Sequence, residues 1–369
     1  TDVSYLACAR FLLSDHTQGC IFPQFATHNA HTLLCIKKMA GDRDMEFQRL
    51  HGMGEELYDT VLSTDKNTNV RIYAPVGAHK DLLPYLVRRL LENGANSSFV
   101  HKLVDPKTPV ETLVDHPLEV LQKNAVLAND KIPLPTALFR DRKNSLGTNL
   151  DIESLHVPFI AKVKQQAEKQ WQAGAMISGE RINCGDAIQV TCPQNREKQV
   201  GQIYWADEQT TEAAIANAYQ AFSTWNNTPV DDRAELLDKL ADALEDNLHE
   251  LIAMCTMEAG KSLQDGIDEV REAVDFCRYY AQQGRKMFNH DPALPGPTGE
   301  RNELFVSGKG VFVCISPWNF PLAIFLGQIT AALVGGNTVI AKPAEQTGLI
   351  AFRTIELMLE VGFPKDVIQ

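Results

Sequence analysis

The sequence predicts an α/β protein in two parts that are joined by a segment of irregular structure. Three observations support this prediction. Short apolar runs alternate with amphipathic stretches in residues 1–100, six prolines interrupt the periodicity in residues 101–170, and a second alternation begins near residue 171. At 369 residues the chain is also too long for one ordinary domain. We therefore expect domains at residues 1–100 and 171–369, with residues 101–170 as a linker or arm.

The first region alternates helices and strands with short polar connections. Helices are expected at residues 4–13, 31–39, 55–62 and 81–93, and strands at residues 21–26, 46–50 and 70–74. Repeated β-α steps of this kind fit either part of a β/α barrel or an open α/β sheet. Both folds place their chemistry on the loops that follow the strands.

The second region contains the pattern of a parallel βαβ unit. Residues 310–315 and 338–341 are short apolar runs of the kind buried in parallel sheets, and an apolar helix lies between them. Before this unit, a hairpin is expected at residues 188–205, followed by helices at residues 212–225, 231–246, 247–259 and 267–282. Ligands bind at the carboxyl ends of parallel strands, so one ligand could touch Asn319, Lys342 and Glu345 together.

Charged segments elsewhere are expected to be solvated. Residues 140–145 (RDRKNS) read as a solvated charged turn of the linker. Glu269, Glu272 and Asp275 are spaced three apart on one helix, which indicates a solvated or ion-paired face, although a role in lining a substrate tunnel is the alternative.

Composition excludes several classes of function. A net charge of −12 and an acidic isoelectric point argue against a nucleic-acid surface in this segment. The eight cysteines show no Cys-x-x-Cys pair and no metal-ligand spacing, which is typical of buried thiols in a reducing compartment. There is no run of 18 apolar residues and no signal pattern, so we expect a cytoplasmic protein. The chain starts at Thr1 and stops after a helix, and we expect it to be a piece of a longer protein.

Two motifs of the second region carry a family resemblance. Residues 315–321 (ISPWNFP) and 339–345 (VIAKPAE) resemble the aldehyde dehydrogenase superfamily in order and spacing. The resemblance implies that the Asn319 amide donates to the oxyanion formed when a cysteine thiolate attacks an aldehyde; one fixed donor of this kind stabilises a transition state by roughly 3 kcal/mol. The alternative for Asn319 is a cap on the next helix. The resemblance also implies an NAD site formed by Ile315, Ser316, Pro317, Trp318, Lys342, Ala344 and Glu345.

Consecutive arginines on the last helix of the first region suggest an anion site. Arg88 and Arg89 point roughly 100° apart, so both reach one small anion only if it lies over the groove between them. A carboxylate suits two guanidinium groups, because each binds it bidentately. A solvated charged face is the alternative. Tyr85 and Glu92 flank the pair on the same helix.

Three segments of the first region resemble the C-terminal half of the proline dehydrogenase barrel, which carries FAD. They are residues 25–29 (FATHN), 46–53 (EFQRLHGM) and 71–77 (RIYAPVG). By this resemblance Arg88 and Arg89 hold the carboxylate of proline, and Tyr73 and Tyr85 wall its ring. The implied flavin contacts are Thr27, His28, Asn29, Gln48 and Glu92.

A chain that carries both resemblances in this order is similar to the bacterial bifunctional flavoenzymes. These combine a proline dehydrogenase with an L-glutamate γ-semialdehyde dehydrogenase. The implied reaction oxidises proline with FAD to pyrroline-5-carboxylate, and then oxidises glutamate semialdehyde to glutamate with NAD. Proline and glutamate semialdehyde are thus the expected substrates. A homo-oligomer, a quinone or membrane-bound electron acceptor and a peripheral position at the inner membrane are further expectations. Other family members carry an N-terminal DNA-binding module, for which these residues offer no test.

The nucleophilic cysteine and the general-base glutamate of such an enzyme are expected beyond Gln369, so this segment alone should be inactive. Cys314 lies inside an apolar strand and is not expected to be the nucleophile. Two other functions are open. One is a single-activity aldehyde dehydrogenase with an unrelated N-terminal appendage, and the other is a proline-sensing regulator or inactive scaffold.

Overall fold

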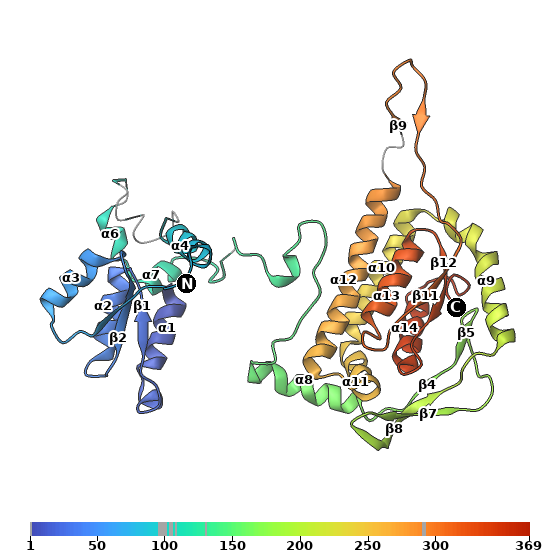
Figure 1. Cartoon of the computed structure of the whole chain (residues 1–369), viewed down its shortest axis with the longest axis horizontal. Coiled ribbons are helices and arrows are strands. Elements are labelled where there is room, and N and C mark those ends of the chain that lie inside the picture. The colour runs from blue at the N-terminus through green and yellow to red at the C-terminus, as the bar shows by residue number, and fades with distance from the viewer. Residues whose placement is uncertain (1, 95–101, 103–105, 108, 130, 290–292) are drawn as a thin grey trace. The chain divides into compact units, whose positions relative to one another are not determined.

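The structure is a computed structural model that describes residues 2–94, 102, 106–107, 109–129, 131–289 and 293–369. It divides into two compact units, Thr1–Asp130 and Lys131–Gln369, and the boundary between them falls within the residues predicted to be a linker (Figure 1). Each unit is described by itself below. No helix in the described ranges is both long and apolar enough to cross a membrane.

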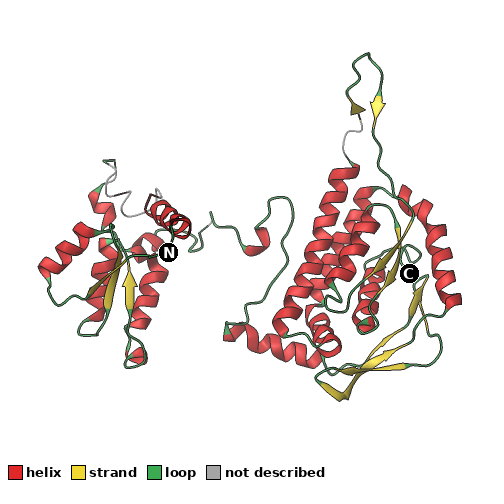
Figure 2. Ribbon diagram, viewed as in Figure 1, coloured by secondary structure: helices red, strands yellow, loops and turns green. Residues whose placement is uncertain are grey.

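The first unit is built on a parallel sheet with strand order β1-β2-β3. The strands are β1 (Gln24–Ala26), β2 (Glu46–Leu50) and β3 (Val70–Tyr73), and each is followed by a helix (Figure 2). The helices are α1 (Asp2–Leu12), α2 (Ala30–Ala40), α3 (Glu55–Thr64), α4 (His79–Gly94), α6 (Val110–Leu113) and α7 (Pro117–Gln122), with a 3₁₀ turn η1 (Asp15–Thr17). The β-α alternation expected from the sequence is confirmed.

Strand β1 is shorter than expected. Ile21 and Phe22 are 46% and 52% exposed, and Pro23 has no N–H to donate to a neighbouring strand, so pairing begins only at Gln24. The core of this unit centres on Phe47 of β2. Its ring lies 6.5 Å from that of Phe25 and 6.4 Å from that of Tyr58.

The second unit combines a helical layer with four small sheets in its described residues. The sheets have strand orders β4-β8-β7, β5-β6, β9-β10 and β11-β12. The strands are β4 (Trp171–Ala173), β5 (Ala175–Ile177), β6 (Glu180–Ile182), β7 (Ile188–Cys192), β8 (Asn195–Ile203), β9 (Ala293–Leu294), β10 (Asn302–Glu303), β11 (Val311–Ile315) and β12 (Thr338–Lys342). The helices are α8 (Glu153–Gln166), α9 (Glu208–Asn227), α10 (Val230–Asp246), α11 (Leu248–Ala259), α12 (Leu263–Phe288), α13 (Ala323–Val334) and α14 (Gly348–Glu360), with a 3₁₀ turn η2 (Pro135–Ala137).

The βαβ unit forms as the sequence predicts. Strands β11 and β12 pair in parallel from Val311↔Thr338 to Ile315↔Lys342, with α13 between them in the chain. Helix α13 is almost entirely buried and packs against α12, while α9 contacts the strand pair (Figure 1). The Trp225 indole of α9 donates to the Leu333 carbonyl at 3.0 Å and ties these helices together.

Helix α8 forms inside the stretch predicted to be irregular. Its Pro158 removes one intrahelical hydrogen bond, which is why the sequence argues against a helix there. Burial of Phe159 and Val163 outweighs this cost. The Phe159 ring lies 5.0 Å from that of His249 on α11, so α8 is packed against the helical layer.

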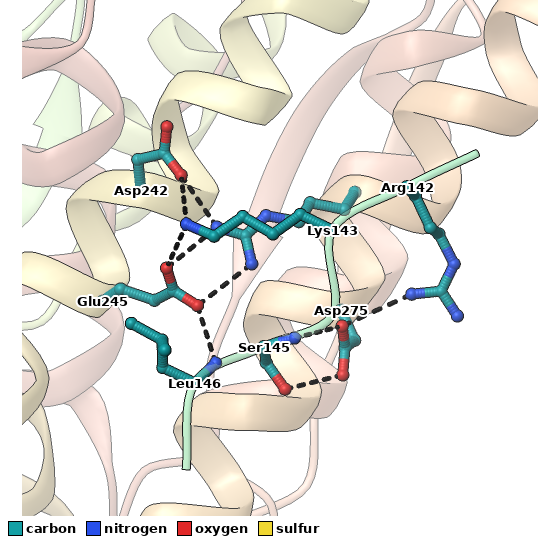
Figure 3. Close-up of polar contacts among 8 residues, drawn as sticks. Arg142, Lys143, Ser145, Leu146, Asp242, Glu245 and Asp275 are labelled. Atoms are coloured by element: carbon teal, nitrogen blue, oxygen red, sulfur yellow. Dashed lines mark hydrogen bonds and ion pairs between the residues drawn. The ribbon is translucent and has the colours of Figure 1, made fainter. Parts of the chain in front are cut away.

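The expectation of a solvated turn at residues 140–145 holds for the exposed Arg140, Asp141 and Lys143, but it is wrong for Asn144 and Ser145, which are buried. Residues 142–146, called the strap below, lie across α10 and α12 and bind carboxylates on both helices (Figure 3). Ser145 is 2% exposed, and its N–H and hydroxyl both donate to Asp275. Lys143 pairs with Glu245 at 3.1 Å, and Leu146 N–H donates to the same carboxylate at 2.8 Å. These partners lie about a hundred or more positions away, so no local pattern announces them.

Glu245 is the central anion of the strap. Its carboxylate also receives two hydrogen bonds from Arg278, at 3.0 and 2.9 Å. Burial opposes its ionisation, but the bonds from Arg278, Leu146 and Lys143 outweigh burial and lower the pKa of Glu245 to about 2. The Glu245 carboxylate therefore accepts the bonds of the strap in its ionised form at neutral pH.

Candidate active sites

The polar residues after β11 and β12 meet at one edge of the strand pair. Ser316 N–H donates to the Lys342 carbonyl at 3.1 Å, which joins the two loops directly. Lys342 and Glu345 form an exposed ion pair at 2.5 Å, and the hydrogen bond from Lys342 lowers the pKa of Glu345. Two of the predicted NAD contacts thus stand side by side.

A cavity of about 470 Å³ opens beside this pair. Lys342 and Glu345 line it together with apolar side chains of neighbouring elements, including Ile177, Trp205 and Phe352. A mainly apolar wall with a few polar groups is typical of small-molecule and cofactor sites, and the volume is in the usual range for them. The residues present therefore fit the adenosine end of NAD.

The other predicted NAD contacts lie at the end of β11 and on the loops that follow β11 and β12, outside the lining of this cavity. Ile315 and Trp318 are 65% and 56% exposed, whereas Ser316 and Ala344 are buried and Pro317 is half-buried. Their roles stay predictions.

Asn319 is exposed on the loop between β11 and α13. The N-cap position of α13 is Leu322, so the helix-cap alternative for Asn319 is wrong. Within the described residues its side chain has no hydrogen-bond partner, which leaves the amide free to meet a ligand. Asn319 and Lys342 follow adjacent parallel strands, which is the arrangement that the sequence predicts.

The sequence analysis missed the role of Glu269. Its side chain is fully buried, pairs with Lys261, and accepts the backbone N–H groups of Leu322 and Ala323. A solvated or ion-paired face was expected at Glu269, Glu272 and Asp275; Glu269 and Asp275 are ion-paired, and Glu272 is exposed. Spacing alone gives no sign that Glu269 points inward to the loop that carries Asn319.

The cysteines near this site are poor nucleophiles. Cys314 is 3% exposed, and burial raises the pKa of its thiol to about 11. Burial also raises the pKa of Cys255 and of Cys277. A group that remains a thiol at neutral pH reacts slowly, so none of these three fits the nucleophile of an aldehyde dehydrogenase.

In the first unit, the tyrosines and one arginine of the predicted proline site lie together. The Tyr85 hydroxyl on α4 is 3.4 Å from the Tyr73 hydroxyl at the end of β3. The guanidinium of Arg89 lies 5.4 Å from the centroid of the Tyr85 ring, within cation–π range. Arg88 is exposed on the same helix. The site therefore offers two aromatic walls and a cation at a carboxyl edge of the sheet.

The predicted flavin residues at the end of β1 form a compact turn. Asn29 caps α2 by accepting from His31 N–H and Thr32 N–H, and its own N–H donates to the Thr27 hydroxyl. Gly54 has a positive φ of 67°, and a Cβ there would lie 2.9 Å from the His28 ring. A glycine at position 54, just before α3, therefore leaves room for the His28 imidazole.

Gln48 is oriented by an ionic network that the sequence did not indicate. Its amide donates to Glu46 at 3.0 Å, and Glu46 also accepts from Nε and Nη2 of Arg71 at 2.6 and 2.8 Å. The Arg71 hydrogen bonds, followed by that of Gln48, lower the pKa of Glu46 to about 2. Amide, hydroxyl and imidazole groups at this edge suit the polar atoms of a flavin. The side chain of Glu92 lies outside the described residues.

Comparison with known proteins decides the family. A model of the aldehyde dehydrogenase family matches residues 181–369, which is more than half of the chain. The chain belongs to the aldehyde dehydrogenase family. A second family model, that of proline dehydrogenase, matches residues 1–102. The N-terminal region is therefore similar to a known enzyme family, which argues against an unrelated appendage.

Several relatives match the whole chain. Bifunctional protein PutA of Salmonella typhimurium is 44% identical over 384 aligned positions, covering 100% of this chain and 28% of the relative. A crystal structure of a Bradyrhizobium japonicum proline utilization A variant has 44% identity and a TM-score of 0.68, covering 100% of this chain and 34% of that one. A Thermus 1-pyrroline-5-carboxylate dehydrogenase with bound NAD is 33% identical with a TM-score of 0.58, covering 63% of this chain and 45% of that one. The chain thus spans little more than a quarter of its curated bifunctional relatives.

Proposed function

We propose that the full-length protein oxidises L-proline to L-glutamate in two steps. In the first, proline is oxidised to pyrroline-5-carboxylate with FAD as the acceptor. After hydrolysis, glutamate semialdehyde is oxidised to glutamate with NAD. The observation that carries this proposal is the match of the whole chain to proteins that join both enzymes in the same order. We assign the first step to residues 1–100, the second to residues 171–369, and the connection to residues 101–170.

In the proline step, the residues at the carboxyl edge of β1-β2-β3 bind and orient the substrate. Arg88 and Arg89 neutralise the carboxylate of proline, while Tyr73 and Tyr85 restrict its ring. FAD, when bound, supplies the hydride acceptor. Thr27, His28, Asn29, Gln48 and Glu92 hold it, and Glu46 directs the Gln48 amide.

In the aldehyde step, Asn319 stabilises negative charge on the aldehyde oxygen after thiolate attack. The neutral amide stands ready before the charge develops, so little reorganisation is needed. NAD, when bound, supplies the hydride acceptor. Lys342 and Glu345 bind its ribose at the cavity, and the backbone of residues 315–318 and Ala344 forms the wall along the dinucleotide.

The cellular setting follows from the same proposal. We place the enzyme in the cytoplasm as a homo-oligomer, at the periphery of the inner membrane when a quinone or another membrane-bound acceptor reoxidises the flavin.

The test uses the purified full-length protein. We expect flavin absorbance, proline-dependent reduction of a dye acceptor, and NADH formation from pyrroline-5-carboxylate. A colourless protein that forms NADH from pyrroline-5-carboxylate would instead support the single-activity aldehyde dehydrogenase. A protein that binds proline but turns over neither substrate would support the regulator or scaffold, and either result overturns the proposal.

A further inference from the structure

The loop that carries Asn319 is held at both ends. At its start, Ser316 N–H donates to the Lys342 carbonyl at 3.1 Å. At its end, Leu322 and Ala323 donate their N–H groups to one oxygen of Glu269, at 3.0 and 2.9 Å. The Asn319 side chain has no hydrogen-bond partner among the described residues, so its position depends on how the backbone of this loop is held.

Lys261 links the second anchor to the residue beside Asn319. Its ammonium pairs with the other oxygen of Glu269, and it lies 4.5 Å from the centroid of the Phe320 ring. The Lys261 side chain is 14% exposed, so this cation is shielded from water and its attraction to the ring is stronger than at an exposed site. Glu269 thus acts on the loop through the backbone and, by way of Lys261, through Phe320.

The position of Lys261 is itself set by the end of α11. Gly260 is left-handed with φ of 73°, and Lys261 N–H donates to the Cys255 carbonyl, which closes the helix. A Cβ at Gly260 would lie 3.0 Å from Pro193 Cγ, so a glycine is favoured both by conformation and by space.

We propose that Glu269, paired with Lys261, is a positioning residue of the aldehyde step that fixes the oxyanion donor Asn319. This inference rests on the proposed function of Asn319. A preorganised donor stabilises a transition state only if it stays where the charge develops, and a misplacement of about 1 Å can cost roughly a hundredfold in rate. The positive end of the α13 dipole and the Lys261 ammonium both favour an anion at this point. Without that anion, two buried N–H groups and a largely shielded ammonium lose their partner.

The test is a double-mutant cycle in the full-length enzyme. Glu269→Leu should lower kcat of aldehyde oxidation by about tenfold or more, with the KM for NAD and proline dehydrogenation nearly unchanged. Glu269→Gln keeps an oxygen that accepts the two N–H groups and should recover most of that loss. In an Asn319→Ala background, Glu269→Leu should cause less than about a twofold further loss, because the donor it positions is already absent.

Glu245→Leu is the matched control. Glu245 is also a nearly buried carboxylate with a cationic partner and a backbone donor, but it belongs to the strap. It should lower the melting temperature without changing kcat of the folded enzyme. If Glu269→Leu does not fold, Lys261→Met takes its place in the cycle, with the same expected non-additivity.

The results separate the two proposals. A loss from Glu269→Leu that is equally large with and without Asn319, or a lower melting temperature with unchanged kcat, would overturn the positioning role. If Asn319→Ala alone leaves kcat unchanged, it is the oxyanion role of Asn319 that fails.

Discussion

Asp275 on α12 accepts two hydrogen bonds from Ser145, one from the N–H at 3.0 Å and one from the hydroxyl at 2.7 Å, across 130 positions of sequence. The same carboxylate pairs with Arg142 at 3.4 Å (Figure 3). A single side chain of the helical layer therefore binds the strap at two places, Arg142 and Ser145.

Removing this carboxylate should release the strap. Asp275→Ala leaves the buried hydroxyl of Ser145 without its acceptor, and we expect a loss of about 2 kcal/mol in the free energy of unfolding. Ser145→Ala, which removes one bond, should cost about 1 kcal/mol. Hydrogen exchange at the Ser145 and Leu146 amides should accelerate in Asp275→Ala. Asp268→Ala, an exposed acid on the same helix, is the control and should leave both measurements unchanged; equal effects at both positions would contradict the specific role of Asp275.

Replacing Arg88 should separate the two activities. Arg88→Met removes a cation from the proposed carboxylate site but leaves the stacking of Arg89 on Tyr85 in place. We expect a KM for proline that is higher by about tenfold or more, equivalent to at least one lost charged hydrogen bond, with unchanged NADH formation from pyrroline-5-carboxylate. Steady-state kinetics of both steps measure this. Lys80→Met, on the same helix, should alter neither step, and a parallel loss of both activities in Arg88→Met would refute the assignment.

Glu258 should make stability depend on pH. This side chain is buried, and burial raises its pKa to about 8 even though Leu349 and Ile350 donate their N–H groups to it. The folded form keeps its proton where the unfolded carboxyl, with its ordinary pKa of 4.5, has lost it. Unfolding therefore releases a proton between these two values, and stability falls as the pH rises through that window.

Glu258→Gln should flatten this dependence. The wild type should lose up to about 1.4 kcal/mol per pH unit between about pH 5 and 8 from this group, and the neutral variant should not. Urea unfolding at several pH values measures the slope. Glu245→Gln is the comparison: the pKa of Glu245 is lowered to about 2, so its contribution is constant in this window and is lost only on acidification. Parallel slopes for wild type and Glu258→Gln would contradict the prediction.

Gly284 allows α12 and α13 to approach closely. An alanine Cβ at this position would overlap the Cγ2 methyl of Val334. Alanine favours a helix over glycine by about 1 kcal/mol, but overpacking costs about 1–3 kcal/mol, so Gly284→Ala should be destabilising on balance. Val334→Ala in the same chain should relieve the overlap, and the double variant should be more stable than the sum of the single changes predicts. Additive effects in thermal unfolding would show that the two positions do not touch.

Much of the fold could be predicted because its signals are local. Strand β2 forms at residues 46–50 as expected, and β11 and β12 fall on the two apolar runs of the βαβ unit. The order of the motifs around Asn319 and Lys342 likewise placed both residues at one sheet edge.

The structural features that could not be predicted from the sequence depend on residues that are distant in the chain. The strap reads as a solvated turn because Asp275 and Glu245 lie far along the chain. Glu269 reads as a surface acid because its acceptor role depends on N–H groups at the start of α13. Helix α8 is hidden by Pro158, whose cost is offset only by burial against α11.

The consecutive helices α11 and α12 hold both of the loops that follow β11 and β12. Glu258, near the end of α11, accepts a backbone N–H at the start of α14, which follows the loop after β12. Glu269 on α12 accepts a backbone N–H at the start of α13, which follows the loop after β11. Because both carboxylates belong to consecutive helices, a movement of these helices should move the two loops together. Under the proposed function, Asn319 and the pair Lys342–Glu345 would then keep their relative positions when the surrounding protein moves.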